Sequence, residues 1–156
     1  MRYYFAPMEG ITTCLYRKLH RRFFPGVDQY YTPFLSPARD HVFSKRDLQE
    51  ILPERNDGVP LVPQLLTKYP EDFIWAAGEL SAMGYPEVNL NLGCPSGTVV
   101  AKGRGSGMLK DLEALERFLD QIFSALPSVH ISVKTRLGIS DESEFSRLLE
   151  IYNQYP

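Results

Sequence analysis

The sequence is poor in the features that mark secreted, membrane-spanning and zinc-binding proteins. Its 156 residues include only two cysteines, Cys14 and Cys94, so we expect no disulfide framework and a reducing, cytoplasmic compartment. No apolar run approaches the roughly 18 residues that a membrane span needs. The three histidines show no metal-ligand spacing with the cysteines, which argues against a zinc site.

An excess of charge of one sign is lacking as well. The formal net charge is −2 and the sequence pI is near 5.9, so the overall basic character typical of nucleic-acid-binding domains is missing. One local cluster, Arg17-Lys18-x-x-Arg21-Arg22, is basic, and we interpret it as the solvated face of a helix. With 44% hydrophobic residues, the chain has the composition of a globular domain that can bury a core.

Five short apolar runs recur along the chain, and several are rich in β-branched or aromatic residues. Their length and composition predict strands and not helices. Pro63 lies inside the third run, where it removes a hydrogen-bond donor, so we expect a bulge there. The predicted strands are residues 3–6, 29–32, 61–65, 87–92 and 130–134.

The stretches between these runs have helical periodicity. Asp111 is expected to cap a helix that buries residues 112, 115, 118, 119, 122, 123 and 126. Pro70 begins another helix, whose buried stripe we expect at residues 73, 77, 80 and 83 or 84. Asp141-x-x-Glu144 resembles a capping box in front of a third helix, with residues 145, 148, 149 and 152 facing inward. Thr12 or Thr13 could cap a first helix with Leu15, Leu19 and Phe23 facing inward, and a short helix is expected at 44–51.

Strands that alternate with helices predict an α/β fold with a parallel sheet. Five such units fit either an open doubly wound domain or the first five units of an eight-stranded TIM (β/α)8 barrel. The last predicted helix is followed by no closing strand within these residues. We therefore predict a partial barrel.

Polar and reactive side chains follow the carboxyl ends of the predicted strands, where parallel α/β folds place their chemistry. They are Gln64, Asn91, Cys94, Lys134 and Arg136. Cys94 lies between Gly93 and Pro95 in a sharp turn, so its thiol should be presented and not packed. A thiol with an unperturbed pKa of about 8.5 is mostly protonated at neutral pH and can act as a general acid. Lys134 could stabilise an anionic cofactor or intermediate.

Three motifs in order resemble the tRNA-dihydrouridine synthases. Ala6-Pro7-Met8-Glu9-Gly10-Ile11-Thr12 is similar to the A-P-M-x-G-x-T opening of that family. Asn91-Leu92-Gly93-Cys94-Pro95, with Met108-Leu109-Lys110-Asp111 behind it, resembles the catalytic loop. Val133-Lys134-Thr135-Arg136-Leu137-Gly138 is similar to its V-K-x-R-x-G strand. Together with Gln64, these motifs cover nearly the whole chain.

The resemblance implies a flavoenzyme that uses FMN and NADPH to reduce the C5=C6 bond of selected tRNA uridines. It assigns Pro7, Met8, Glu9, Gln64 and Lys134 to the flavin, Asn91 and Arg136 to the substrate, and Cys94 to proton donation. These assignments agree with the chemistry, because a flavin can deliver hydride to one face of uracil while an acid protonates the other.

Members of that family continue through three more strands and a helical tRNA-binding domain. We accordingly interpret residues 1–156 as the N-terminal portion of the FMN-binding domain, and expect the chain alone to bind FMN weakly and not to turn over. Two alternatives stay open. One is a flavin barrel acting on a free pyrimidine, like dihydroorotate or dihydropyrimidine dehydrogenases. The other is a non-catalytic fragment that self-associates through exposed strand edges.

Overall fold

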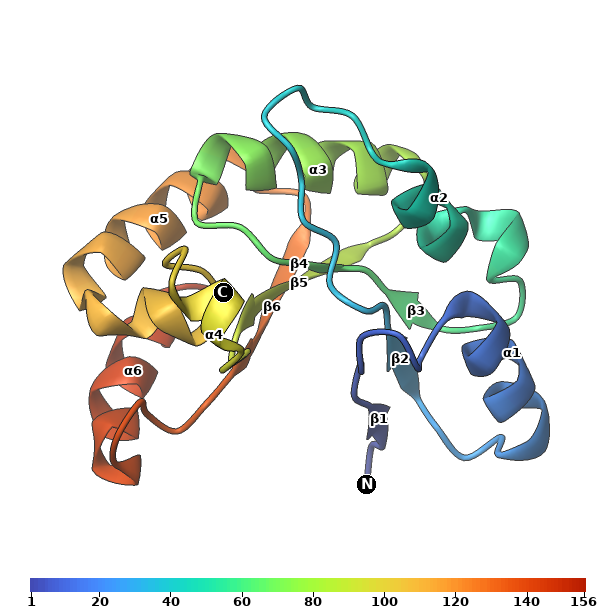
Figure 1. Cartoon of the computed structure of the whole chain (residues 1–156), viewed down its shortest axis with the longest axis horizontal. Helices are drawn as coiled ribbons and strands as arrows, with labels where there is room; N and C mark the ends of the chain where they lie inside the picture. The colour runs from blue at the N-terminus through green and yellow to red at the C-terminus, as the bar shows by residue number, and fades with distance from the viewer.

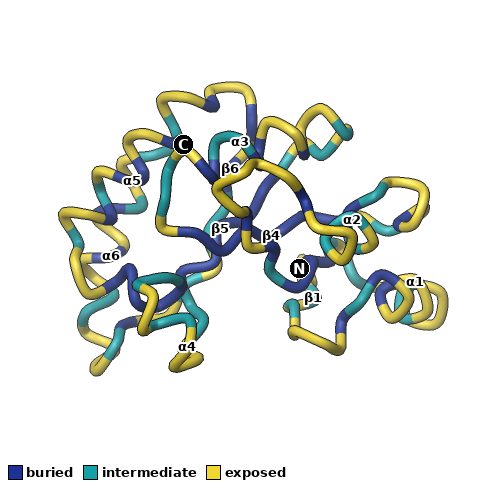
Figure 2. The backbone as a smooth tube through the Cα atoms, turned by 45° about the horizontal axis from the view of Figure 1, so that its top comes forward, coloured by how far each residue is buried: buried dark blue, intermediate teal, exposed yellow.

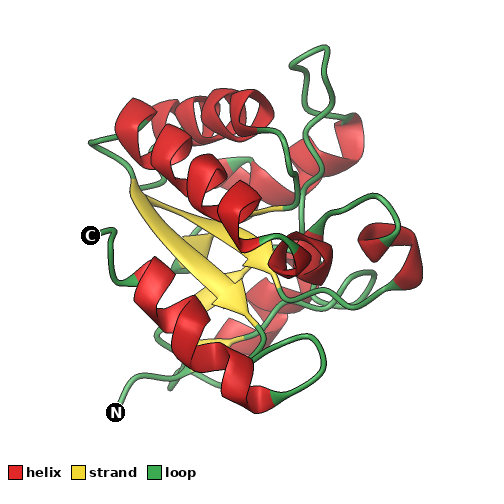
Figure 3. Ribbon diagram, turned by 90° about the vertical axis from the view of Figure 1, so that its left-hand side faces the viewer, coloured by secondary structure: helices red, strands yellow, loops and turns green.

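The computed structural model describes residues 1–156, and it is an α/β structure with parallel strands (Figures 1 and 3). The predicted runs form strands close to the expected positions. Residues 87–92 and 130–134 are confirmed almost to the residue, whereas the first run contributes only two residues to its strand. The strands are β1 Tyr4–Phe5, β2 Gln29–Tyr31, β3 Leu61–Val62, β4 Gln64–Leu65, β5 Glu87–Leu92 and β6 His130–Thr135.

Pro63 interrupts the third predicted run, as expected, and divides it into β3 and β4. Strands β1, β2 and β3 pair in that order, and β4, β5 and β6 form a second parallel group in the same manner. The carbonyl of Pro63 still accepts from the backbone N–H of Asn89 on β5 at 2.8 Å. Neighbouring strands therefore follow chain order throughout, without the reversal of strand order that defines a doubly wound sheet.

Helices follow one another around the outside of these strands (Figure 1). The main core lies between the strands and helices α3 (Pro70–Ala82) and α5 (Leu112–Ala125). The stripe expected for α3 is confirmed at Phe73, Ala77 and Leu80, which are fully buried, whereas Leu112 and Phe123 of the stripe expected for α5 are only partly buried. On α5 the residues at 115, 118, 119 and 122 are buried in the same way. Periodic burial of this kind is what holds an amphipathic helix on a sheet.

Local capping signals in the sequence also correspond to real helix starts. Asp111 accepts from the backbone N–H of Ala114 at the start of α5. Ser44 and Asp47 form a reciprocal capping box at the start of α2 (Lys45–Ile51). The box at Asp141 and Glu144 opens a 3-10 turn, Glu142–Glu144, which continues into α6 (Phe145–Tyr152). These caps satisfy backbone donors that the first helical turn leaves free.

The orientation predicted for the first helix is wrong. Helix α1 (Cys14–Phe23) begins after Thr13, but Leu15, Leu19 and Phe23 are 65%, 47% and 68% exposed. Figure 2 shows much of this helix at the surface. Its inner side instead carries Arg17, which is fully buried, so the basic cluster is not simply a solvated helix face.

Arg17 is buried with acceptors around both terminal nitrogens of its guanidinium, while its Nε has no hydrogen-bond partner. It donates to the carbonyls of Thr12 and Glu50, to the Glu50 carboxylate and to the Asn56 side chain, each at 2.7–2.8 Å. Burial lowers the pKa of Arg17, and the hydrogen bond and charge of Glu50 oppose that effect. A buried charge with this many partners joins α1 to the segment around α2.

Two smaller departures concern short helices and one leucine. The loop after β5 contains a four-residue helix, α4 (Gly97–Val100), and a 3-10 segment, Gly105–Lys110, neither of which we predicted. A further 3-10 turn, Pro53–Arg55, follows α2. Leu149, expected to face inward on α6, is 43% exposed, while Leu148 and Ile151 are buried. No helix in the structure has both the length and the apolar character needed to cross a membrane.

Candidate functional site

Polar side chains occupy one face of β5 and continue onto its neighbours. The strand reads Glu87-Val88-Asn89-Leu90-Asn91-Leu92, and alternate residues of a strand point to opposite faces. The register places Asn89 beside Gln64 on one side and beside Ser132 on the other. The apolar residues of β5 therefore enter the core, and the polar ones meet on the opposite face.

These side chains form a continuous series of hydrogen bonds, which we call the polar ladder: Asn91, Gln64, Asn89, Ser132 and Glu87. Asn91 Nδ2 donates to Gln64 Oε1 at 2.8 Å, and Gln64 Nε2 donates to Asn89 Oδ1 at 2.8 Å. Asn89 Nδ2 donates to Ser132 Oγ at 2.8 Å, and Ser132 Oγ donates to Glu87 Oε1 at 2.6 Å. Gln64 is fully buried, and Asn89 and Asn91 are 2% and 7% exposed.

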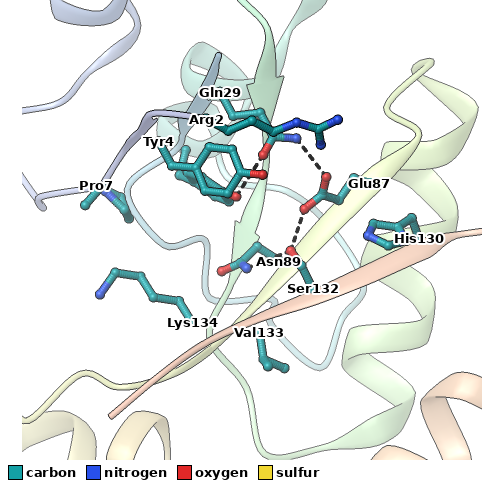
Figure 4. A pocket seen from close by; sticks show the side chains of 12 residues that line it. Arg2, Tyr4, Pro7, Gln29, Glu87, Asn89, His130, Ser132, Val133 and Lys134 are labelled. Atoms are coloured by element: carbon teal, nitrogen blue, oxygen red, sulfur yellow. Dashed lines mark hydrogen bonds between the residues drawn. The ribbon is translucent and has the colours of Figure 1, made fainter. Parts of the chain in front are cut away.

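The ladder has one direction, since every link donates toward Glu87. An ionised carboxylate can only accept, so Glu87 fixes the orientation of the Ser132 hydroxyl and, through it, of each amide in turn. The second oxygen of Glu87 accepts from Gln29 Nε2 at 3.0 Å, and Gln29 Oε1 accepts from the Tyr31 hydroxyl at 3.1 Å (Figure 4). Burial, with smaller effects of Glu87 and Tyr4, raises the pKa of Tyr31 to about 12, so this hydroxyl stays a donor.

The other end of the ladder organises the loop that carries Cys94. With its Nδ2 directed to Gln64, Asn91 turns Oδ1 toward the loop and accepts from the backbone N–H groups of Gly93 and Cys94 at 3.1 and 2.9 Å. The Cys94 carbonyl accepts from the backbone and hydroxyl of Ser106 at 3.1 and 2.9 Å. Cys94 is half-buried, with its peptide groups held on both sides.

Two glycines allow neighbouring segments to approach this loop closely. A Cβ at Gly105, whose φ is +56°, would lie 2.9 Å from the Cys94 carbonyl oxygen. A Cβ at Gly93 would lie 3.3 Å from the carbonyl oxygen of Lys134, so the Cys94 loop sits directly against the end of β6. Larger side chains at these positions would push the loop away from both contacts.

A cavity of about 400 Å³ opens on the polar face of the strands (Figure 4). Lys134 and Pro7 line it near the carboxyl ends of the strands, and its lining also includes Tyr4, Tyr31 and Asn89. The ammonium group of Lys134 has no acidic partner within ion-pairing distance and makes no hydrogen bond, unlike the arginine at position 17. Lys134 is exposed, so its ammonium group is solvated in the open cavity and free to meet an anionic or electron-rich ligand.

The sequence of this chain matches a known family along nearly its whole length. A family model described as dihydrouridine synthase matches residues 4–153. The chain belongs to the dihydrouridine synthase family. Among its relatives is a tRNA-dihydrouridine(16) synthase of Salmonella typhimurium, 33% identical over 145 residues, which cover 88% of this chain and 46% of the relative.

Two other relatives give the same result. A protein of Synechocystis sp. named probable tRNA-dihydrouridine synthase 1 is 32% identical over 137 residues, 87% of this chain and 37% of its own length. One of Bacillus subtilis, named probable tRNA-dihydrouridine synthase 2, is 30% identical over 146 residues, 92% of this chain and 44% of its own. The chain thus spans less than half the length of these relatives.

The predicted site residues of this dihydrouridine synthase chain fall into three places. Gln64, Asn91 and Cys94 belong to the ladder and the loop it holds, and Pro7 and Lys134 line the cavity. The remaining three lie elsewhere. Met8 is 58% exposed, Glu9 pairs with Arg46 at 3.6 Å across a second cavity, and Arg136 Nε donates to the Gly138 carbonyl at 3.3 Å.

Sequence reasoning missed Glu87, Asn89, Ser132 and Gln29 as members of the site. Their signal was present, because Glu87, Asn89 and Asn91 alternate with apolar residues at the period of a strand. We read that run only as an apolar strand with a polar end. Alternation of polar and apolar residues predicts a strand with one apolar face and one polar face, and the polar face of this strand carries the ladder.

Proposed function

We propose that the protein carrying this chain reduces the C5=C6 bond of uridine in tRNA to give dihydrouridine, with FMN as cofactor and NADPH as reductant. The observation that carries the proposal is Cys94, whose loop is fixed by the Asn91 carboxamide and lies against the end of β6, beside the cavity that Lys134 enters. The names of the relatives supply the substrate, tRNA, and the site supplies the chemistry.

The fold supports this proposal through the order of its strands. We propose that the described units are the first five of an eight-stranded (β/α)8 barrel and the N-terminal portion of its FMN-binding domain. Sequential pairing of parallel strands is what such a barrel requires. The relatives are more than twice as long as the part that this chain matches, which leaves room for three further strands and a helical tRNA-binding domain.

The donor set near Lys134 fits a flavin. The cavity offers an unpaired ammonium group, the apolar ring of Pro7 and, through the ladder, the amide of Gln64 behind it. Lys134 would stabilise negative charge at the pyrimidine end of the ring system. We assign Pro7, Met8, Glu9, Gln64 and Lys134 to this cofactor site. When bound, FMN would supply the two electrons of the reduction to C6 of the uracil.

The protein's own residues then complete the reduction at C5. The Cys94 thiol transfers its proton to C5 from the face opposite the cofactor, which leaves a thiolate that water reprotonates. Asn91 Nδ2 uses one hydrogen for Gln64 and keeps the other for a uracil carbonyl. Arg136, at the end of β6, is assigned to the same substrate. The base must leave its stack to reach this loop, as in other enzymes that modify bases.

The test is Cys94→Ala in the full-length protein that carries this chain, with Cys14→Ala as the matched control. Cys14 is a buried thiol on α1 and lies outside the site. Loss of a general acid lowers the rate about 10²- to 10⁴-fold. We expect dihydrouridine formation in bulk tRNA to fall by that amount while flavin stays bound, with the control near normal.

Normal turnover by Cys94→Ala would refute the assignment of the proton donor. Assay of free uracil beside bulk tRNA separates the proposed activity from that of an enzyme for free pyrimidines. Reduction of free uracil at a rate equal to that of tRNA would favour the latter and overturn the proposed substrate.

A further inference from the structure

Three loops at the carboxyl ends of β2, β4 and β5 bring basic groups to one aromatic ring. We call Arg39, Lys68, Tyr69 and Arg104 the rim patch. The Arg39 guanidinium carbon lies 4.5 Å from the centre of the Tyr69 ring, and the Lys68 ammonium lies 5.5 Å from it. A Cβ at Gly103, the residue before Arg104, would lie 3.5 Å from Lys68 Nζ. The three loops therefore meet.

The cations of the rim patch have no acidic partners. Arg39, Lys68 and Arg104 form no salt bridge and no side-chain hydrogen bond, and Arg104 Nε is buried without any partner. The paired arginines of the chain lie elsewhere, on helices, where each meets a glutamate. In a chain of net charge −2, unpaired cations gathered on one rim make a local site for an anion.

The loop that carries Arg39 is held in place by His41. This residue adopts φ +55°, the only positive φ outside glycine, and its ring stacks on Trp75 with centroids 5.1 Å apart and planes 3° apart. His41 Nε2 lies 3.5 Å from Oδ1 of Asp72, a carboxylate that is 2% exposed. A strained conformation kept by two contacts on α3 fixes where Arg39 points.

The rim patch is also close to the reactive thiol. Gly105 contacts the Cys94 carbonyl, and Gly103 contacts Lys68. Two residues of chain span at most about 7 Å, so Gly103 beside Lys68 and Gly105 beside Cys94 are no further apart than that. A polymer whose reactive unit lies at Cys94 would place its neighbouring units over the rim patch.

We propose that the rim patch binds the phosphates of a single-stranded RNA segment on either side of the base that enters the site. This inference rests on the proposed function, because it takes the base at Cys94 to belong to an RNA chain. Arg39 supplies a planar fork of donors, held over the Tyr69 ring, and Lys68 supplies a point charge. A single strand fits better than a duplex, since its bases are free to unstack toward Cys94.

The test measures binding of a fluorescein-labelled RNA stem-loop to the 156-residue chain by anisotropy over a series of salt concentrations. Each phosphate contact to a single strand contributes about 0.7 to the slope of log affinity against log salt, so Arg39→Ala/Lys68→Ala should lower that slope by about 1.4. Arg117→Ala is the control, because it removes an exposed cation from α5 that is paired with Glu113. It should leave the slope unchanged.

His41→Ala separates positioning from direct contact. Without the His41 contacts the loop is mobile, and RNA binding must then order the Arg39 side chain. The affinity for RNA should therefore fall about two- to tenfold, while the salt slope stays as in the parent chain. Tyr69→Phe keeps the ring under Arg39 and should bind normally. The thermal midpoint of each variant is measured beside its affinity for RNA. Because Arg39 and Lys68 are exposed, we expect their double variant to unfold at the midpoint of the parent chain.

Several results would overturn the inference. The first two are an unchanged salt slope in the double variant and equal affinity of the parent chain for a fully paired RNA stem. The third is full competition by NADPH, which would make the rim patch a nucleotide site. The fourth is absence of RNA binding by the parent chain. These outcomes are independent of the proposed reduction.

Discussion

Replacement of Asn91 by alanine tests whether the carboxamide holds the Cys94 loop. The substitution removes the acceptor for two backbone N–H groups, those of Gly93 and Cys94, and the donor to Gln64 Oε1. The two backbone groups are half-buried and can find water once the loop moves. Gln64 is fully buried, so its oxygen loses a partner that water cannot easily replace.

The size of the effect follows from these three contacts. A hydrogen bond contributes about 1 kcal/mol net, so loss of three costs about 3 kcal/mol. For a chain of this length, each kcal/mol lowers the thermal midpoint by about 2–4 °C, which gives a fall of about 6–12 °C. Release of the loop should also expose the half-buried thiol, and Cys94 should then react faster with iodoacetamide.

Calorimetry and alkylation followed by mass spectrometry measure the two effects on the same samples. Asn153→Ala is the control, because Asn153 is exposed and its side chain makes no hydrogen bond. Asn91→Asp is a second variant that keeps both acceptor contacts but turns an oxygen toward Gln64, so it should lose stability while the thiol reacts as in the parent chain. A midpoint for Asn91→Ala within about 2 °C of the parent, with unchanged alkylation, would refute the reasoning.

Three further outcomes are expected. Arg17→Met removes one partner of a buried ion pair and leaves the Glu50 carboxylate and Asn56 oxygen without their donor, so urea unfolding should show a loss of about 3–5 kcal/mol, whereas exposed Lys18→Met should change stability little. The 156-residue chain should purify without stoichiometric flavin; a yellow preparation with one FMN per chain would contradict this. The same chain should elute from size exclusion above the 17.8 kDa of a monomer, because strand edges and the apolar residues of α1 are exposed.

Much of the fold could be predicted because its signals are local. Strand β5, helix α5 and the boxes at Ser44 and Asp141 depend on residues within a few positions of one another. Which side of helix α1 faces the protein interior could not be predicted in the same way. Its sequence has a clear apolar stripe, but periodicity does not tell whether a partner covers that stripe, and in this chain the buried side carries Arg17, whose acceptors come from residues up to 39 positions away.

In the candidate site, too, local features could be predicted and tertiary ones could not. Cys94 and Lys134 could be predicted from their place after strands, since parallel sheets collect such groups at one edge. The direction in which the amides of Gln64 and Asn91 point could not, because it is decided by Glu87 and Ser132 through contacts between three strands. Sequence patterns place residues on a face, whereas hydrogen-bond direction depends on the tertiary register.

The one-way donation along the polar ladder also constrains how the family can vary over evolutionary time. Reversing any single amide sets two oxygens or two N–H groups against each other. A lone exchange of Asn89 for aspartate likewise places an oxygen where an N–H group donates to Ser132, so we expect selection against it at this buried position. Viable change must come as compensated pairs that reverse neighbouring links together. An alignment of relatives should therefore show correlated substitutions at positions 64, 89, 132 and 87, and a set that varied independently would mean that each side chain finds its own partner.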